Sequence, residues 1–215
     1  MIMKTRFIMI RHGFSVANNE KRFAGHSDFP LTELGKLQAE RCAEALADEK
    51  IDVIYTSDLS RAASTAVPIA RSHKMEMIPH KGLREIFAGE WEGKTFDELC
   101  VAFAEDYSVW KNDIGNARCT GGESPAELSK RVLSTLMEIA SRHEGDTVCI
   151  ATHATPIRAV CTAAAGFAPS QMARIPWTAN ASISIFEYEN GKFVAVEISR
   201  VDHLGDLKTA LPSNV

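Results

Sequence analysis

The sequence predicts an α/β fold, a three-layer α/β/α sandwich with a mostly parallel central sheet. Three observations support this prediction. Short apolar segments alternate along the chain with amphipathic helical patterns, and polar loops follow several of those segments directly. The length of 215 residues and an apolar content of 45% fit one domain with a sizeable core, which we expect to span residues 1–215.

Strands are expected where a short apolar run is bounded by polar or turn residues. Such runs occupy residues 5–10, 53–56 and 74–78, the last of them ended by Pro79. A further run follows a turn within residues 145–152. Residues 182–188 and 192–200 are expected to form a β-hairpin around Asn190-Gly191.

Helices are expected where apolar residues recur at helical spacing. Residues 32–48 carry such a stripe behind Thr32 as a helix cap, and residues 60–72, 94–112 and 156–165 give three more helices. The segment Ser124-Pro125-Ala126-Glu127 combines a capping box with proline at the first helical position. It predicts the start of a long helix that ends near His143.

Composition argues against several classes of protein. The net charge is −4, which is unlike a general nucleic-acid binder. No apolar run reaches the length of a membrane span, and the first residues hold too short a run for a signal peptide, so no membrane association is expected. The five cysteines are widely spaced without a Cys-x-x-Cys pair, which indicates free thiols in a cytoplasmic protein.

Polar side chains of two kinds follow three of the expected strands. Arg11, His12 and Gly13 come directly after the first strand. Arg61 begins the helix after the second strand, and His153 follows the strand that ends near residue 152. Ligands of parallel sheets bind outside the carboxyl ends of the strands. If these strands are neighbours, two imidazoles and two guanidiniums meet in one crevice.

This combination of side chains suits a phosphoryl group. A neutral imidazole nitrogen can attack phosphorus, since its pKa lies near physiological pH. Guanidiniums bind phosphoryl oxygens through paired, charge-assisted hydrogen bonds, and a second imidazole can donate another. Gly13 would let the backbone approach closely. Each residue alone has an ordinary explanation as a turn, a surface charge or a strand-end histidine, so the prediction of a small phosphorylated ligand depends on all three strand ends together.

Five blocks in a fixed order extend this pattern over most of the chain. They lie at residues 7–13 with Asn18, 28–35, 55–62, 83–93, and finally 121–124 with Arg131 followed by 151–158. Together they resemble the histidine phosphatase superfamily, in its phosphoglycerate-mutase-like branch. The resemblance covers about residues 5–200.

The resemblance implies a role for each matching residue. His12 would be the nucleophile that forms a phosphohistidine. Arg11, Arg61 and His153 would bind the phosphoryl oxygens and take part in catalysis. Asn18 would assist in binding the substrate as a hydrogen-bond donor.

A carboxylate and three departures complete the implied site. Glu85 would be the general acid that protonates the leaving group and then the base that activates water. Phe14 stands where the family usually has Glu or Gln. Ala154 replaces the usual Gly after the second histidine, where its backbone N–H would still contact the substrate, and Thr155 is also atypical. These three departures are expected to affect which substrate shape fits the site more than they affect the reaction itself.

The resemblance also implies an activity. The protein would be a metal-independent phosphatase that hydrolyses small phosphomonoesters through His12, with no cofactor, and we expect a homodimer. Only residues 94–122, a small helical cap insertion, separate the fourth and fifth blocks, where cofactor-dependent mutases have a longer insertion. The short cap favours hydrolysis. A phosphoglycerate mutase-type isomerase is the alternative, followed by a non-catalytic phospho-ligand binding module and a metalloenzyme using His12 and His153.

Two further features are ambiguous in the sequence. The triplet Asn180-Ala181-Ser182 fits a glycosylation acceptor, which is not expected to be used in a cytoplasmic protein. Four aromatic residues fit either the core or the lining of an apolar substrate pocket: Phe14, Phe23, Phe103 and Trp110.

Overall fold

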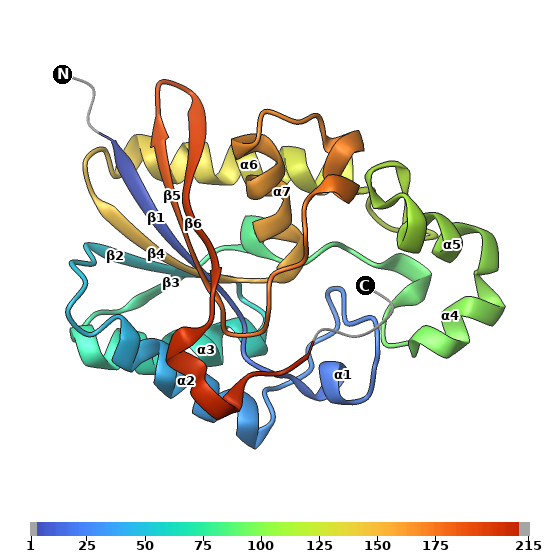
Figure 1. Cartoon of the computed structure of the whole chain (residues 1–215), viewed down its shortest axis with the longest axis horizontal. Coiled ribbons are helices and arrows are strands. Elements are labelled where there is room, and N and C mark those ends of the chain that lie inside the picture. The colour runs from blue at the N-terminus through green and yellow to red at the C-terminus, as the bar shows by residue number, and fades with distance from the viewer. Residues whose placement is uncertain (1–3, 211–215) are drawn as a thin grey trace.

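A six-stranded mixed sheet forms the centre of the computed structural model, which describes residues 4–210 (Figure 1). The strand order is β3-β2-β4-β1-β5-β6. Four strands are parallel: β1 (Thr5–Arg11), β2 (Val53–Thr56), β3 (Met77–Pro79) and β4 (Thr147–Thr152). The hairpin of β5 (Ile183–Glu189) and β6 (Lys192–Arg200) is antiparallel and completes one edge. The expected, mostly parallel sheet is confirmed.

Helices cover both faces of the sheet. One face packs against α2 (Glu33–Ala45) and α3 (Ser60–His73), and the other packs against α6 (Pro125–Arg142) and α7 (Ala154–Ala164). The short α1 (Val16–Asn19) follows β1, and α4 (Phe96–Ala102) and α5 (Ala104–Asn112) project at one end of the molecule (Figure 1). The three layers of the predicted sandwich are therefore present.

The alternation of side chains along β1 explains why helices are needed on both faces. Successive residues of a strand point to opposite sides of the sheet. Phe7 and Met9 belong to the core beneath α6 and α7, whereas Ile8 and Ile10 belong to the core against α2 and α3. All four side chains are fully buried. A continuous apolar run of this kind is typical of a central parallel strand.

The predicted helix over residues 94–112 is wrong in one respect, because the chain forms two helices there. The break falls at Phe103, whose φ of −133° and ψ of 40° are not helical. The rings of Phe96 and Tyr107 stack with their centroids 6.4 Å apart. In one straight helix these residues would be roughly 16 Å apart along the axis, at about 1.5 Å per residue. The bend lets both helices contribute to one aromatic core around Trp91.

Several element boundaries also differ from the prediction, and the helix expected over residues 32–48 ends at Ala45. The strand expected at residues 74–78 lies at Met77–Pro79, so Pro79 is part of the strand instead of ending it. Proline is tolerated there because β3 is an edge strand and needs no ladder bond on its outer side. The last predicted helix begins at Ala154, two residues earlier than expected, directly after His153.

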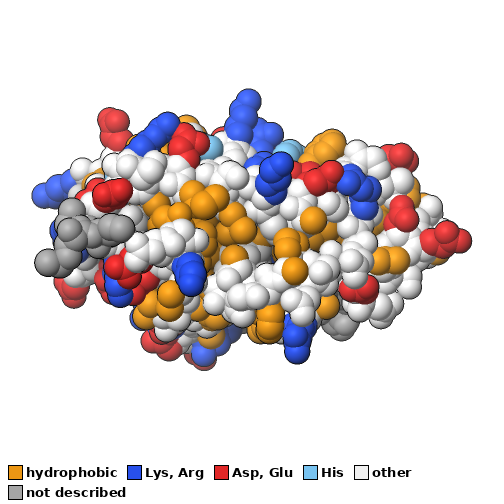
Figure 2. Space-filling model, turned by 90° about the horizontal axis from the view of Figure 1, so that it is seen from above, with side chains coloured by type: hydrophobic (Ala, Val, Ile, Leu, Met, Phe, Trp, Pro, Cys, Tyr) orange, Lys and Arg blue, Asp and Glu red, His pale blue; other side chains and the backbone are white. Residues whose placement is uncertain are grey.

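The surface carries charges of both signs. Figure 2 shows Lys and Arg side chains interspersed with Asp and Glu side chains on one face, with hydrophobic side chains between them. This face has no continuous basic stripe of the kind that a nucleic-acid backbone requires. Among the helices within residues 4–210, none is long and apolar enough to cross a membrane.

Candidate active site

The carboxyl ends of the neighbouring strands β1 and β4 bring two histidines together. The strands are in register with Arg11 opposite Thr152, so His12 and His153 leave the sheet side by side. Their ring centroids are 5.2 Å apart, with an interplanar angle of 63°. Both side chains are almost completely buried, at 5% and 0% exposure. The meeting of two imidazoles that the strand ends predicted is present.

The hydrogen bonds of His12 fix its tautomer. Its Nδ1 lies 2.8 Å from the carbonyl oxygen of Gly13. A carbonyl oxygen can only accept, so Nδ1 carries the proton and Nε2 keeps its lone pair. The backbone N–H of His12 donates to the carbonyl of Thr152 across to β4. The ring is therefore oriented with Nε2 as a potential nucleophile.

Gly13 allows this turn to pass tightly over α2. A Cβ at this position would lie 2.5 Å from the carbonyl oxygen of Gly35, closer than any side chain tolerates. The N–H of Gly13 donates to Oγ1 of Thr65 on α3 at 3.0 Å. Helices α2 and α3 thus hold the turn that carries His12, and Gly13 is required here for its close packing on Gly35.

Two buried arginines flank the histidines. Arg61 is fully buried and donates from its two terminal nitrogens to the carbonyls of Ser27 and Gly25, at 2.9 and 2.7 Å. Arg11 is 6% exposed and donates to the carbonyl of Thr178. The Nε atoms of both arginines are buried without a hydrogen-bond partner among the described residues. Each guanidinium therefore has a donor left for an anion.

The electrostatics of the cluster follow from burial. Desolvation, reinforced by the charges of Arg61 and Arg11, lowers the pKa of His12 and of His153 well below the usual 6.5. Both imidazoles are therefore neutral near pH 7. Burial also lowers the pKa of Arg11 to about 10, partly offset by Glu85, so this guanidinium stays charged.

His153 has one ring nitrogen without a partner. Its Nε2 lies 2.8 Å from Oγ of Ser57, at the end of β2. Its Nδ1 is buried and makes no hydrogen bond within residues 4–210. Buried polar atoms are normally paired, and buried cations need a compensating charge. Three unpaired nitrogens in one cationic cluster fit an oxyanion that binds among them.

A pocket of about 100 Å³ adjoins this cluster. Arg11 lines the pocket and so connects it to the histidines. Asn18, Glu85, Ala154 and Thr155 give it a polar side. Its aromatic side is formed by Phe23, Phe96, Trp110 and Trp177. Of the four ambiguous aromatic residues, Phe23 and Trp110 line this pocket, and Phe14 and Phe103 are not part of its lining.

Asn18 is held by a residue that the sequence did not reveal. Oδ1 of Asn18 accepts hydrogen bonds from Ser15 and from Nδ2 of Asn180, the latter at 3.1 Å, so its own Nδ2 is oriented to donate. Asn180 is 4% exposed and also donates to the carbonyl of His12. Burial excludes the glycosylation acceptor as a use of this side chain. No local signal identifies Asn180, because its partners lie over 160 positions away.

The carboxylate of Glu85 lies over the first turn of α7. Its Oε1 accepts from the N–H of Ile86 at 2.8 Å, and its Oε2 accepts a longer bond from the N–H of Thr155 at 3.4 Å. The N-terminus of a helix favours a negative charge. Glu85 also lines the pocket that Arg11 and Asn18 line.

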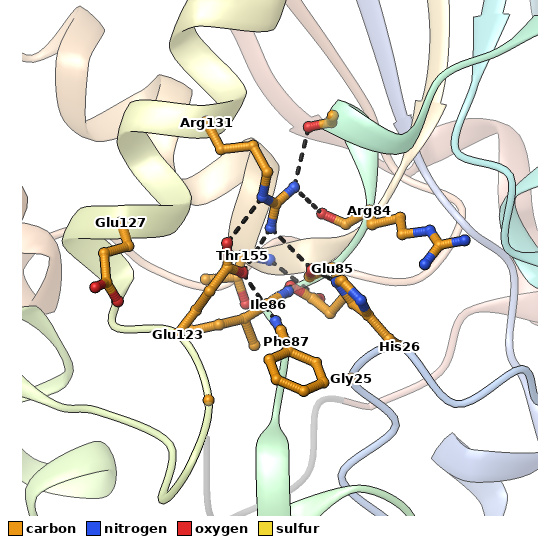
Figure 3. Close-up of polar contacts among 12 residues, drawn as sticks. Gly25, His26, Arg84, Glu85, Ile86, Phe87, Glu123, Glu127, Arg131 and Thr155 are labelled. Carbon is orange, nitrogen blue, oxygen red and sulfur yellow. Dashed lines mark hydrogen bonds and ion pairs between the residues drawn. The ribbon is translucent and has the colours of Figure 1, made fainter.

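Arg131 on α6 holds the loop that carries Glu85 (Figure 3). Its guanidinium forms an ion pair with Glu123 at 2.7 Å. The Glu123 carboxylate in turn accepts from the N–H of Phe87 at 2.9 Å. The remaining bonds of Arg131, each 3.0 Å long, go to the carbonyls of Gly82, Arg84 and Glu85. A planar donor group that holds this many acceptors restrains the backbone on both sides of Glu85.

The departures at positions 154 and 155 have a structural explanation. His153 is the N-cap residue and α7 begins at Ala154, so both departures lie in the first helical turn. Neither Ala154 nor Thr155 has a positive φ. A helical residue does not need the conformational freedom of glycine. Phe14 instead donates its backbone N–H to Gln38 at 2.7 Å, on the α2 side.

Residues 7–200 match the histidine phosphatase superfamily, branch 1. The chain belongs to this superfamily. It is 34% identical over 204 residues to phosphoserine phosphatase 1 of Hydrogenobacter thermophilus, covering 94% of this chain and 95% of that protein. It is 28% identical to the 2,3-bisphosphoglycerate-dependent phosphoglycerate mutase 2 of Gloeobacter violaceus, covering 91% of each.

Solved structures agree with this assignment. The structure of Bacillus stearothermophilus YhfR matches with a TM-score of 0.88 and 30% identity, over 93% of this chain and 99% of that one. The chain is therefore an enzyme of the histidine-phosphatase type, which hydrolyses phosphomonoesters. The family that the five sequence blocks indicated is confirmed.

The two histidines are poorly suited to a metal ion. No group of three or more His, Cys, Asp or Glu side chains that could hold a metal occurs in the part of the chain that the structure describes. The guanidiniums of Arg11 and Arg61 stand close enough to lower the histidine pKa values and would repel a cation. The donor set thus gives the metalloenzyme hypothesis no support.

The lowered histidine pKa values predict a loss of stability in mild acid. Below about pH 6.5 the unfolded chain binds protons on these imidazoles and the native chain does not, so protons favour unfolding as the pH falls. We expect His12→Gln to lose about 2 kcal/mol less unfolding free energy than the wild type between about pH 7 and about pH 5. Urea denaturation at the two pH values measures the difference.

Proposed function

We propose that this enzyme hydrolyses small phosphomonoesters through a covalent phosphohistidine on His12. The observation that carries the proposal is the buried cationic cluster, in which a neutral imidazole with a free Nε2 faces a second imidazole at 5.2 Å. Unpaired nitrogens of Arg11, Arg61 and His153 supply donors around it. A phosphoryl group offers the three oxygens that such a set of donors requires.

In the first half of the reaction, Nε2 of His12 attacks phosphorus. The N–P bond forms as the P–O bond to the leaving group breaks. Arg11, Arg61 and His153 stabilise the charge on the equatorial oxygens, aided by Nδ2 of Asn18. Glu85, in its protonated form, gives its proton to the departing oxygen, so that an alcohol leaves instead of an alkoxide.

In the second half, a water molecule takes the place of the alcohol. The Glu85 carboxylate accepts a proton from water as its oxygen attacks phosphorus. The N–P bond breaks, the lone pair returns to Nε2 of His12, and inorganic phosphate leaves. One carboxylate therefore acts first as acid and then as base.

We propose that residues 94–122 are the cap over the leaving group. Phe96 and Trp110 come from this segment and line the pocket with Phe23 and Trp177. Aromatic walls favour a leaving group with some apolar surface. The cap holds only two helices and a short 3-10 turn, so an alcohol product has few contacts to retain it. This supports hydrolysis over the mutase-type transfer.

His12→Ala should abolish turnover of phenyl phosphate, lowering kcat by about 10⁴-fold or more, because no other neutral imidazole replaces its Nε2. Acid-quench trapping with labelled substrate should detect a phosphoenzyme in the wild type and none in the variant. His80→Ala, a histidine outside the cluster, should behave as the wild type in both assays. Retained turnover in His12→Ala would reject the mechanism, and interconversion of 2- and 3-phosphoglycerate faster than phosphate release would favour the mutase.

Glu85→Gln should discriminate between leaving groups. An alkyl phosphate needs a proton on its departing oxygen, and loss of a general acid costs about 10²–10⁴-fold. An aryl phosphate with a good leaving group needs little protonation and should slow far less in the first half-reaction. Single-turnover rates with the two substrates check this. Equal slowing of both would remove Glu85 from the role of acid.

Arg131→Lys tests whether the hydrogen bonds and the ion pair of Arg131 hold the loop around Glu85 in place. A lysine cannot bind Glu123 and three carbonyls together, so the carboxylate should lose its position. We expect alkyl phosphate hydrolysis to fall by about tenfold more than aryl phosphate hydrolysis, an effect on the acid step alone. A variant with an unchanged alkyl-to-aryl ratio and only a lower Tm would mean that Arg131 serves stability. Arg142→Lys, on the exposed end of α6, is the matched control.

A further inference from the structure

A second cationic hollow lies beside the proposed active site and has no role in the mechanism. Its cavity measures about 270 Å³. The 3-10 turns Ile114–Asn116 and Pro169–Arg174 pack together there, which brings the end of α5 beside the chain that leaves α7 (Figure 1). The lining includes Trp110, Lys111, Arg158 and Trp177. It contains two cations and no acidic residue.

Arg158 is the unusual member of this lining. It is 5% exposed, yet its guanidinium has no ion pair or hydrogen bond with any residue in 4–210. Its guanidinium lies over the ring of Trp177, with Cζ of Arg158 4.3 Å from the ring centroid. Burial lowers its pKa to about 10, so the group is still charged at neutral pH. A buried cation without a counter-charge is costly, and the buried arginines of folded proteins in general are paired.

The hollow shares a wall with the catalytic pocket. Trp110 and Trp177 line both cavities, and their ring centroids are 6.3 Å apart. Arg158 lies one helical turn after Ala154, which lines the catalytic pocket. Lys111, on the exposed end of α5, also lines the hollow and adds a second positive charge. An anion bound here would therefore touch the residues that shape the leaving-group pocket.

We propose that Arg158 and Lys111 form an anion-binding subsite behind the Trp110–Trp177 wall, which takes a carboxylate or a similar small oxyanion. The guanidinium would provide paired charge-assisted hydrogen bonds, and the indole of Trp177 keeps it in place from the other side. The oxyanion comes either from the far end of a substrate or from a free molecule. The first case rests on the proposed phosphatase function, and the second does not.

The substrate source is tested with phenyl phosphate and 4-carboxyphenyl phosphate, which differ by one carboxylate. We expect wild-type kcat/KM to favour the carboxylated ester by about tenfold, as one charge-assisted hydrogen bond allows. Arg158→Gln should abolish this preference and leave phenyl phosphate hydrolysis within about threefold. Arg174→Gln is the matched control, since this exposed arginine also stacks on a ring, that of Phe167, but lies outside the cavity lining.

The free-anion source is tested by adding malonate and measuring the Tm and the tryptophan fluorescence of the protein. Saturating malonate should raise the Tm of the wild type and change its fluorescence, and Arg158→Gln should remove both effects. Lys111→Gln, on the surface, should weaken them without risk to folding. Absence of any hydrolysis would count against the proposed function alone, because the malonate assay needs no turnover. The subsite is refuted if neither a carboxylate preference nor malonate binding occurs, or if both persist in Arg158→Gln.

Discussion

The burial of positive charge without a carboxylate partner is the constraint on which this molecule depends. Arg11 and Arg61 sit at the carboxyl ends of the sheet and, within residues 4–210, donate only to backbone carbonyls. The charge of Glu85 acts on both arginines without a hydrogen bond to either of them in the part of the chain that the structure describes. A folded chain can tolerate such a cluster because carbonyl dipoles partly replace water. The same arrangement leaves the site preorganised for an oxyanion, which removes the imbalance when it binds.

The supporting structure is arranged around this cluster. Helices α2 and α3 hold the Gly13 turn from one face of the sheet, through the close approach to Gly35 and the bond to Thr65. From the other face, α6 holds the Glu85 loop through Arg131, and α7 begins at Ala154 beside it. The two layers of helices therefore position opposite halves of the site, His12 from one side and Glu85 from the other.

The aromatic cap links this site to the second hollow. The break at Phe103 folds α4 and α5 against Trp91, and it places Trp110 where it lines both cavities. Arg158 faces the second hollow from α7. The shapes of the two cavities thus depend on the same cluster of aromatic rings, because Trp110 and Trp177 line both. The proposed oxyanion subsite follows the same principle as the catalytic cluster, since in both a buried guanidinium lacks its counter-charge.

The sequence by itself determined the layered fold and much of the candidate site. Strand ends carry strong local signals, so His12, Arg61 and His153 could be placed at one edge of a parallel sheet, and the family blocks added Glu85 and Asn18. The tertiary structure alone decided the rest. The bend at Phe103, the support from Asn180, the clamp at Arg131 and the unpaired charge of Arg158 all depend on contacts between residues far apart in the chain. Periodicity and capping patterns report only on neighbours within a turn or a strand, so they carry no information on such contacts.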